Sequence, residues 1–172
     1  GISPDSPEVS VKPASMPVPT VGDLVVQYKT SDTNPGDNQF RPQLRIVNNG
    51  ATAVALKDVK LRYYFTIDGE KTQQFNVDYA TVGGSNVLGS FVKLTPGVTG
   101  AEYYVEISFT AGAGSLAPGA NTGEIQLRIN KTDWSNYNEV GDYSYDSSKT
   151  SFTDWTHVPL YLNGTLAWGL EP

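Results

Sequence analysis

The sequence predicts an all-β fold, an antiparallel nine-stranded β-sandwich of the jelly-roll type. Several runs of the chain alternate apolar and polar residues with a period of two, which is typical of strands buried on one face. Turn residues recur between these runs, since the 172 residues include 17 glycines and 11 prolines. No segment shows the periodicity of an amphipathic helix.

The four clearest strand patterns lie at residues 24–28, 59–67, 103–109 and 125–130, where every second residue is apolar. Further strands are expected near residues 43–47, 73–79, 90–94 and 158–162. Asn163-Gly164 is a two-residue hairpin signal that leads into a last strand at 166–168. About nine short strands joined by turns fit one sandwich domain over residues 23–172.

The first 22 residues predict a proline-rich interdomain linker. Small and polar residues separate five prolines there, and such stretches favour an extended, semi-rigid spacer. A frayed terminus is the alternative. The prolines are Pro4, Pro7, Pro13, Pro17 and Pro19.

Composition excludes several classes of function. The net charge is −6 and the basic residues are scattered, which disfavours a nucleic-acid partner. No apolar run reaches 18 residues, so we expect no membrane span. The absence of cysteine removes disulfides, thiolate metal sites and cysteine nucleophiles.

Trp134 stands in an unexpectedly polar stretch, beyond the strand whose wet face carries Gln126, Arg128 and Asn130. We expect its ring to be exposed, and an exposed indole needs a partner to cover it. The alternative is that it folds back over a sheet edge. Rings and amides in one line suit a flat polysaccharide, because rings cover the C–H faces of sugars and amides bond their hydroxyls.

Four segments, in order, resemble the family 3 carbohydrate-binding modules of bacterial cellulases and cellulosome scaffolds. Together they span nearly everything from about residue 23 to the end. They are residues 61–69 (LRYYFTIDG), 101–109 (AEYYVEISF), 133–137 with 141–144 (DWSNY and GDYS), and 161–164 with 168–172 (YLNG and WGLEP).

The resemblance implies a non-catalytic module that binds crystalline cellulose, or a related β-glucan, through a planar strip. The strip positions fall on Asp78, Tyr79, Arg128 and Trp134, with an acid–arginine pair in line with the rings; Gln126 and Asn38 would be polar anchors. Strict alternation would point Asp78 and Tyr79 to opposite faces, so both can join the strip only where the strand ends or bulges.

Two departures from the family pattern shorten this strip. Tyr79 stands where many members have histidine, which keeps a flat, polar-tipped ring. The segment at residues 83–87 is shorter than in scaffold-type members and lacks the loop for a further strip tyrosine. The resemblance is therefore to enzyme-linked members.

The resemblance also implies a structural calcium ion. Calcium takes six to eight oxygen ligands, and the family site falls on Thr66, Asp68, Asn138, Gly141 and Asp142. Gly141 replaces an asparagine found in many members, so water or a carbonyl would supply that ligand. The alternative is that Asp68 and Asp142 are ordinary turn residues.

The family context implies a secreted, extracellular monomer that is covalently linked to catalytic or scaffold domains. Two other functions remain open: a helper module packed on a cellulase catalytic domain, which usually lacks the strip aromatics, and a small jelly-roll glycosidase. A retaining glycosidase needs two carboxyl groups about 5–5.5 Å apart, and Glu102, Glu106 and Glu124 are candidates. His157, the only histidine, has no evident catalytic partner.

Overall fold

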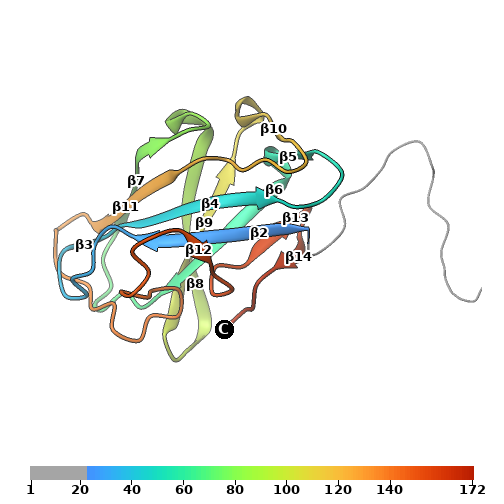
Figure 1. The fold of residues 1–172 in the computed structure, drawn as a ribbon. Helices are drawn as coiled ribbons and strands as arrows, with labels where there is room; N and C mark the ends of the chain where they lie inside the picture. Colours follow the sequence, from blue (N-terminus) through green and yellow to red (C-terminus); the bar gives the residue numbers. More distant parts are fainter. Residues whose placement is uncertain (1–22) are drawn as a thin grey trace, which may run out of the picture.

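The computed structural model describes residues 23–172 and shows two β-sheets packed face to face (Figure 1). One sheet has six strands in the order β12-β2-β4-β11-β3, with β7 paired to the other side of β11. The second has five strands in the order β14-β13-β6-β9-β8. The linker expected at residues 1–22 lies outside the described residues.

The six-stranded sheet, which carries the candidate site, comprises β2 (Leu24–Thr30), β3 (Gln39–Phe40), β4 (Pro42–Asn48), β7 (Gln73–Ala80), β11 (Ile125–Lys131) and β12 (Thr153–Asp154). The opposite sheet comprises β6 (Val59–Phe65), β8 (Val87–Val98), β9 (Ala101–Phe109), β13 (Leu160–Leu162) and β14 (Thr165–Trp168). A separate pair is formed by β5 (Val54–Ala55) and β10 (Ser115–Leu116). All strand pairs are antiparallel.

Nine of these strands have three or more residues, and they match the nine expected from the sequence. Their apolar alternates fill the space between the sheets, where residues such as Leu24, Val26, Leu61 and Ile107 are fully buried. The only helical elements among residues 23–172 are three short 3-10 turns, η1 (Leu56–Asp58), η2 (Gly84–Asn86) and η3 (Ala111–Ala113). The all-β jelly-roll prediction is confirmed.

No helix within the described part of the chain has the length and apolar character needed to cross a membrane.

His157 is a packing residue, since its ring stacks on Tyr143 with centroids 4.2 Å apart and planes 2° apart. Its Nδ1 lies 2.7 Å from the Tyr143 carbonyl oxygen.

A β-bulge interrupts β7 where it pairs with β11. Gln126 pairs with Tyr79, but the next residue of β11, Leu127, pairs with Val77, which leaves Asp78 as the extra residue. The bulge cancels one step of the alternation. Asp78 reaches Arg128 on the outer face, and Tyr79 shares that face with Gln126. The sequence analysis required a strand end or a bulge for Asp78 and Tyr79 to share one face, and the structure has that bulge.

Candidate functional site

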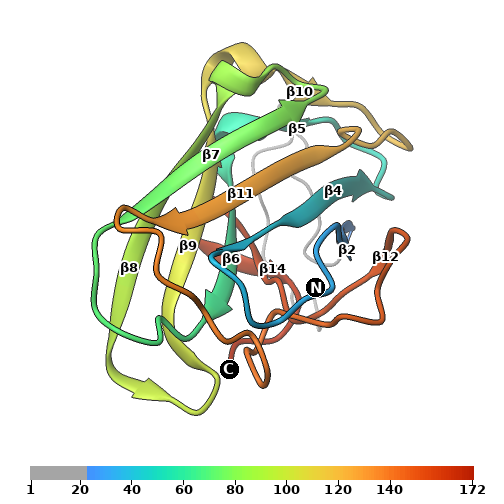
Figure 2. The same ribbon diagram turned by 90° about the vertical axis from the view of Figure 1, so that its left-hand side faces the viewer.

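The outer face of the six-stranded sheet carries the candidate site, and Figure 2 shows β7, β11 and β4 side by side on it. Inward residues of β11, such as Leu127 and Ile129, are buried in the core. The alternate residues Gln126 and Arg128 face outward, because successive side chains of a strand point to opposite faces. A row of polar groups thus lies on the outer face of this sheet.

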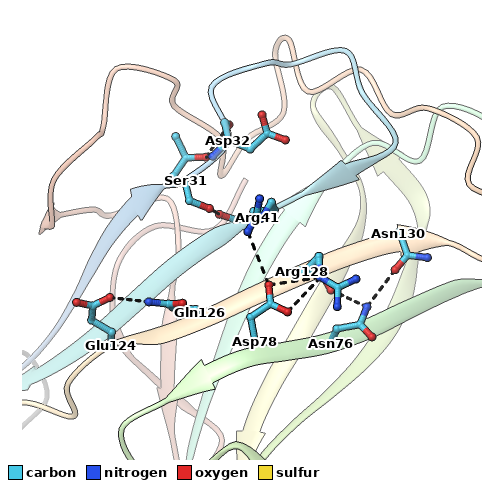
Figure 3. A network of polar contacts seen from close by, with 10 residues as sticks. Ser31, Asp32, Arg41, Asn76, Asp78, Glu124, Gln126, Arg128 and Asn130 are labelled. Atoms are coloured by element: carbon cyan, nitrogen blue, oxygen red, sulfur yellow. Dashed lines mark hydrogen bonds and ion pairs between the residues drawn. The ribbon is translucent and has the colours of Figure 1, made fainter.

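An ion pair lies at the centre of this face (Figure 3). Arg128 Nε donates to Asp78 Oδ1 at 3.1 Å, and both side chains are 30% exposed. Arg41, which follows β3, adds a second cation with its Nη2 4.0 Å from Asp78 Oδ2. The predicted acid–arginine pair is present, and Arg41 is a participant that sequence reasoning missed.

Two aromatic side chains are exposed on either side of this pair along the strands. Tyr79 is 52% exposed and Trp134 is 49% exposed. Tyr79 lies at the level of Gln126, and Trp134 lies in the turn three residues beyond Lys131, the last residue of β11, so the two flank the Arg128 position along the strand. The expectation that Trp134 is exposed is confirmed.

The Trp134 loop is held in an unusual conformation. Trp134 has φ +59°, a left-handed value that side chains other than glycine seldom adopt. Its N–H donates to the Lys131 carbonyl at 3.0 Å, and Asp133 Oδ1 accepts from the Ser135 N–H and hydroxyl. Such strain persists only where surrounding contacts fix it, and it often marks a functional position.

The two predicted polar anchors differ in their surroundings. Gln126 Nε2 donates to Glu124 Oε1 at 2.9 Å, so its amide is oriented on the same face as Arg128 (Figure 3). Asn38 is half-buried in the loop before β3, and its side chain makes no hydrogen bond within residues 23–172. Asn76 was not anticipated; its Nδ2 donates to the carbonyl of Arg128 and to Asn130 Oδ1.

The predicted calcium residues come together at one end of the sandwich. Asp142 Oδ1 accepts from the Thr66 hydroxyl at 2.6 Å and from its N–H at 3.1 Å. Asp68 has φ +58°, and its Oδ2 accepts from the Asn138 N–H at 2.7 Å. Gly141 has φ +81° in the same loop. The structure thus brings together residues that are about 75 positions apart in sequence.

The charges around this loop favour a cation. Burial, together with the neighbouring charges of Asp68 and Glu102, raises the pKa of Asp142 to about 7, against the lowering effect of the Thr66 hydrogen bonds. Burial and nearby carboxylates raise the pKa of Glu139 to about 9. Glu139 is 2% exposed and its Oε2 accepts no hydrogen bond from any group in residues 23–172, so in that range a buried acceptor is left without a donor.

These donors fit calcium better than a transition metal. Within residues 23–172, no group of three or more His, Cys, Asp or Glu side chains is placed to hold a metal by itself. The loop instead combines the carboxylates of Asp68 and Asp142 with the Thr66 hydroxyl and the Asn138 amide. Hard oxygen ligands of this mixed kind are those that calcium accepts.

Lys131 joins the turn at Asp68 to the loop that carries Trp134. It is only 1% exposed, and its Nζ donates to the Asp68 carbonyl at 3.0 Å and to the Asn136 carbonyl at 3.3 Å. The ammonium also lies 4.9 Å from the Tyr137 ring centre. Burial lowers the pKa of Lys131, opposed by the charges of Asp68 and Asp133. Sequence reasoning missed this residue, because it sits at the inward position of an otherwise apolar alternation.

Replacing Lys131 with methionine should lower the free energy of unfolding by about 2–4 kcal/mol, since the buried ammonium and its two hydrogen bonds to carbonyls are lost. Urea titration followed by tryptophan fluorescence measures this change. Lys57, whose side chain is 60% exposed, gives the matched control, and Lys57→Met should change stability by less than about 0.5 kcal/mol. Equal stabilities for the two variants would show that the Lys131 contacts contribute little.

The three candidate glycosidase carboxylates are not arranged as a catalytic pair. Glu124 immediately precedes β11 of the six-stranded sheet, whereas Glu102 and Glu106 are four residues apart on β9 of the opposite sheet, roughly 13 Å along the strand. Glu102 Oε1 accepts from the Ile67 N–H, and Glu106 pairs with Arg62 at 3.6 Å. Hydrolysis needs carboxyl groups about 5–9.5 Å apart.

Comparison with known proteins agrees with this geometry. The family model "Cellulose binding domain" matches residues 25–169. The chain is 48% identical over 153 residues to a β-mannanase/endoglucanase A of Caldicellulosiruptor saccharolyticus, covering 89% of the chain but 12% of that protein. It is 50% identical to "Uncharacterized protein in celA 5′region" of Paenibacillus lautus, covering 86% of the chain and all of that protein.

Among solved structures, the fold is similar to CBM3b of the major scaffoldin subunit ScaA from Acetivibrio cellulolyticus, crystallised in the presence of nickel. The TM-score is 0.85 at 45% identity, covering 88% of this chain and 99% of that one. Fold and sequence agree. The chain belongs to the family 3 carbohydrate-binding modules, the cellulose binding domain family.

Proposed function

We propose that this chain binds crystalline cellulose through the strip formed by Tyr79, the Asp78–Arg128 pair and Trp134, with Gln126 and Asn38 as anchors. The observation that carries this proposal is that two half-exposed rings, Tyr79 and Trp134, flank the Asp78–Arg128 pair on the outer face of one sheet. Exposed ion pairs add only about 0–1 kcal/mol to stability, so the exposed pair is explained better by recognition than by folding.

Each part of the strip has a distinct role in this proposal. The Trp134 and Tyr79 rings cover apolar C–H faces of successive glucose units. Arg128 and Asp78 hold each other in one plane and offer donors and acceptors to the hydroxyls. Arg41 lies beside them and supplements the donors, and the Gln126 amide, oriented by Glu124, contacts the sugar edge.

We further propose that Thr66, Asp68, Asn138 and Asp142, with the Gly141 carbonyl, hold a structural calcium ion. The ion would supply positive charge to a loop in which buried carboxylates otherwise repel each other. Gly141 leaves open space where other members have a side chain, so water can complete the ligand set there.

In this proposal the protein is a secreted, monomeric module, and residues 1–22 link it to a catalytic or scaffold domain. Relatives such as the β-mannanase/endoglucanase A are longer than the chain, which is consistent with an attached partner. The module would hold that partner at the surface of plant cell wall cellulose. A helper role is disfavoured because helper modules usually lack exposed strip aromatics.

The experiment that tests this function is depletion of the protein from solution by microcrystalline cellulose. We expect a saturable isotherm, and no release of reducing sugar from soluble cellulose derivatives. Binding without sugar release separates a binding module from a glycosidase. A protein that stays in solution at every cellulose load would contradict the proposal.

A further inference from the structure

A second group of side chains lies on the same outer face, beyond β4 at the β2 and β12 side of the sheet. The Arg45 guanidinium carbon lies 4.4 Å from the centre of the Phe152 ring, and Lys29 Nζ lies 4.9 Å from the same centre. Phe152 immediately precedes β12, and its ring is partly exposed. Two cations therefore face one phenyl ring.

These cations share the face of the proposed cellulose strip. Lys29 pairs with Gln43 across β2 and β4, and Gln43 pairs with Gln126 across β4 and β11. Paired residues point to the same face of a sheet, so Lys29 lies two strands, or about 10 Å, from the Gln126 anchor. One polysaccharide surface can therefore reach both places.

Neither cation has a carboxylate partner within residues 23–172. Arg45 Nε donates to Gln27 Oε1 at 2.8 Å, and the Gln27 amide donates in turn to Asp154 Oδ1 at 3.0 Å. Asp154 thus bonds the amide rather than a cation. In a chain of net charge −6, two adjacent unpaired cations stand out.

The spacing of the two cations suits a single carboxylate. Gln27 pairs with Arg45, so Lys29 and Arg45 are diagonal neighbours, whose spacing is roughly 7–8 Å. One carboxylate can accept from both, one oxygen each, at the usual N–O distance of about 2.8 Å. The Phe152 ring beside them offers an apolar plate for a sugar face.

We propose that Lys29, Arg45 and Phe152 form a second subsite, which binds the carboxylate of a uronic-acid unit carried by a cell-wall polysaccharide. The choice of a polysaccharide rests on the proposed cellulose-binding function. A long polyanion such as nucleic acid is disfavoured, since the overall negative charge repels it and only two cations are grouped here. The subsite would hold acidic hemicellulose beside cellulose.

The test compares the parent with the double variant Lys29→Gln/Arg45→Gln and with Lys57→Gln, an exposed lysine elsewhere. Each is assayed by affinity electrophoresis on glucuronoxylan, on the same xylan with its carboxyl groups reduced, and on polygalacturonate. We expect the parent to bind glucuronoxylan about tenfold more tightly than the reduced form. The double variant should lose that preference, and Lys57→Gln should keep it.

Binding to microcrystalline cellulose separates this inference from the proposed function, because the double variant should bind cellulose within about twofold of the parent. A preference for polygalacturonate alone would support uronate binding from a different source. Salt at 0.5 M should weaken uronate binding, since exposed charges are screened. Equal binding of the charged and reduced xylans by the parent, or an undiminished preference in the double variant, would overturn the inference.

Discussion

Replacing Trp134 with alanine should weaken binding to microcrystalline cellulose by about 30-fold or more, equivalent to about 2 kcal/mol, the usual cost of losing a central aromatic contact. The ring is half-exposed and held by a loop whose conformation depends on Asp133 and Lys131, so removing it deletes contact area without opening the core. Depletion isotherms measure the change.

The matched control is Leu88→Ala on the opposite sheet, because Leu88 is 50% exposed, close to the 49% of Trp134. It should bind cellulose like the parent. Both variants should keep melting temperatures within a few degrees, since exposed substitutions seldom change stability by more than about 0.5 kcal/mol. Arg128→Ala should also weaken binding; if it and Trp134→Ala both bind like the parent, the strip is assigned to the wrong residues.

Removing calcium with EGTA should lower the melting temperature by about 10 °C. An ion present at about a thousand times its dissociation constant stabilises the folded state by about 4 kcal/mol, and a domain of this size shifts by roughly 2–4 °C per kcal/mol. Scanning calorimetry of the stripped protein, before and after calcium is added back, measures the effect.

Asp142→Asn should abolish the calcium-dependent shift, because Asp142 is the buried carboxylate that bonds Thr66. Asp154→Asn, an exposed carboxylate on β12, should leave the shift intact. Magnesium should restore less stability than calcium, since it keeps its waters and demands octahedral geometry. A melting temperature indifferent to calcium would show that the loop is stable without an ion.

The strands were predictable because each has a strict apolar alternation. Residues 125–129 bury every second side chain, as their pattern predicts, and residues 59–65 follow the same pattern except that Tyr64, expected to face water, is also buried. Exposure of Trp134 was also predictable, because its neighbours are polar and the alternation ends before it. Local patterns suffice where one face of a strand meets the core and the other meets water.

The conformation of the loop at residues 139–142 and the contact of Arg41 with Asp78 depended on interactions that no local pattern encodes. Val140 is 69% exposed and its neighbour Glu139 is 2% exposed, the reverse of what their polarity predicts. The loop is fixed by backbone bonds from Glu139 to Pro35 and from Asp142 to Glu139, which turn the carboxyl inward. Arg41 joins Asp78 only because β3 and β7 flank the same strand, a fact of topology rather than of sequence.

The extra residue in β7 sets the spacing of the functional groups on this face. A regular strand repeats its outward side chains every two residues, about 6.6 Å, and a polymer of different repeat would drift out of step with it. At Asp78 and Tyr79 two consecutive residues face outward together, which shifts the series of outward-facing positions by one residue. One inserted residue can therefore adjust the spacing of the outward side chains to the repeat of a bound polymer, and no flexible segment is needed.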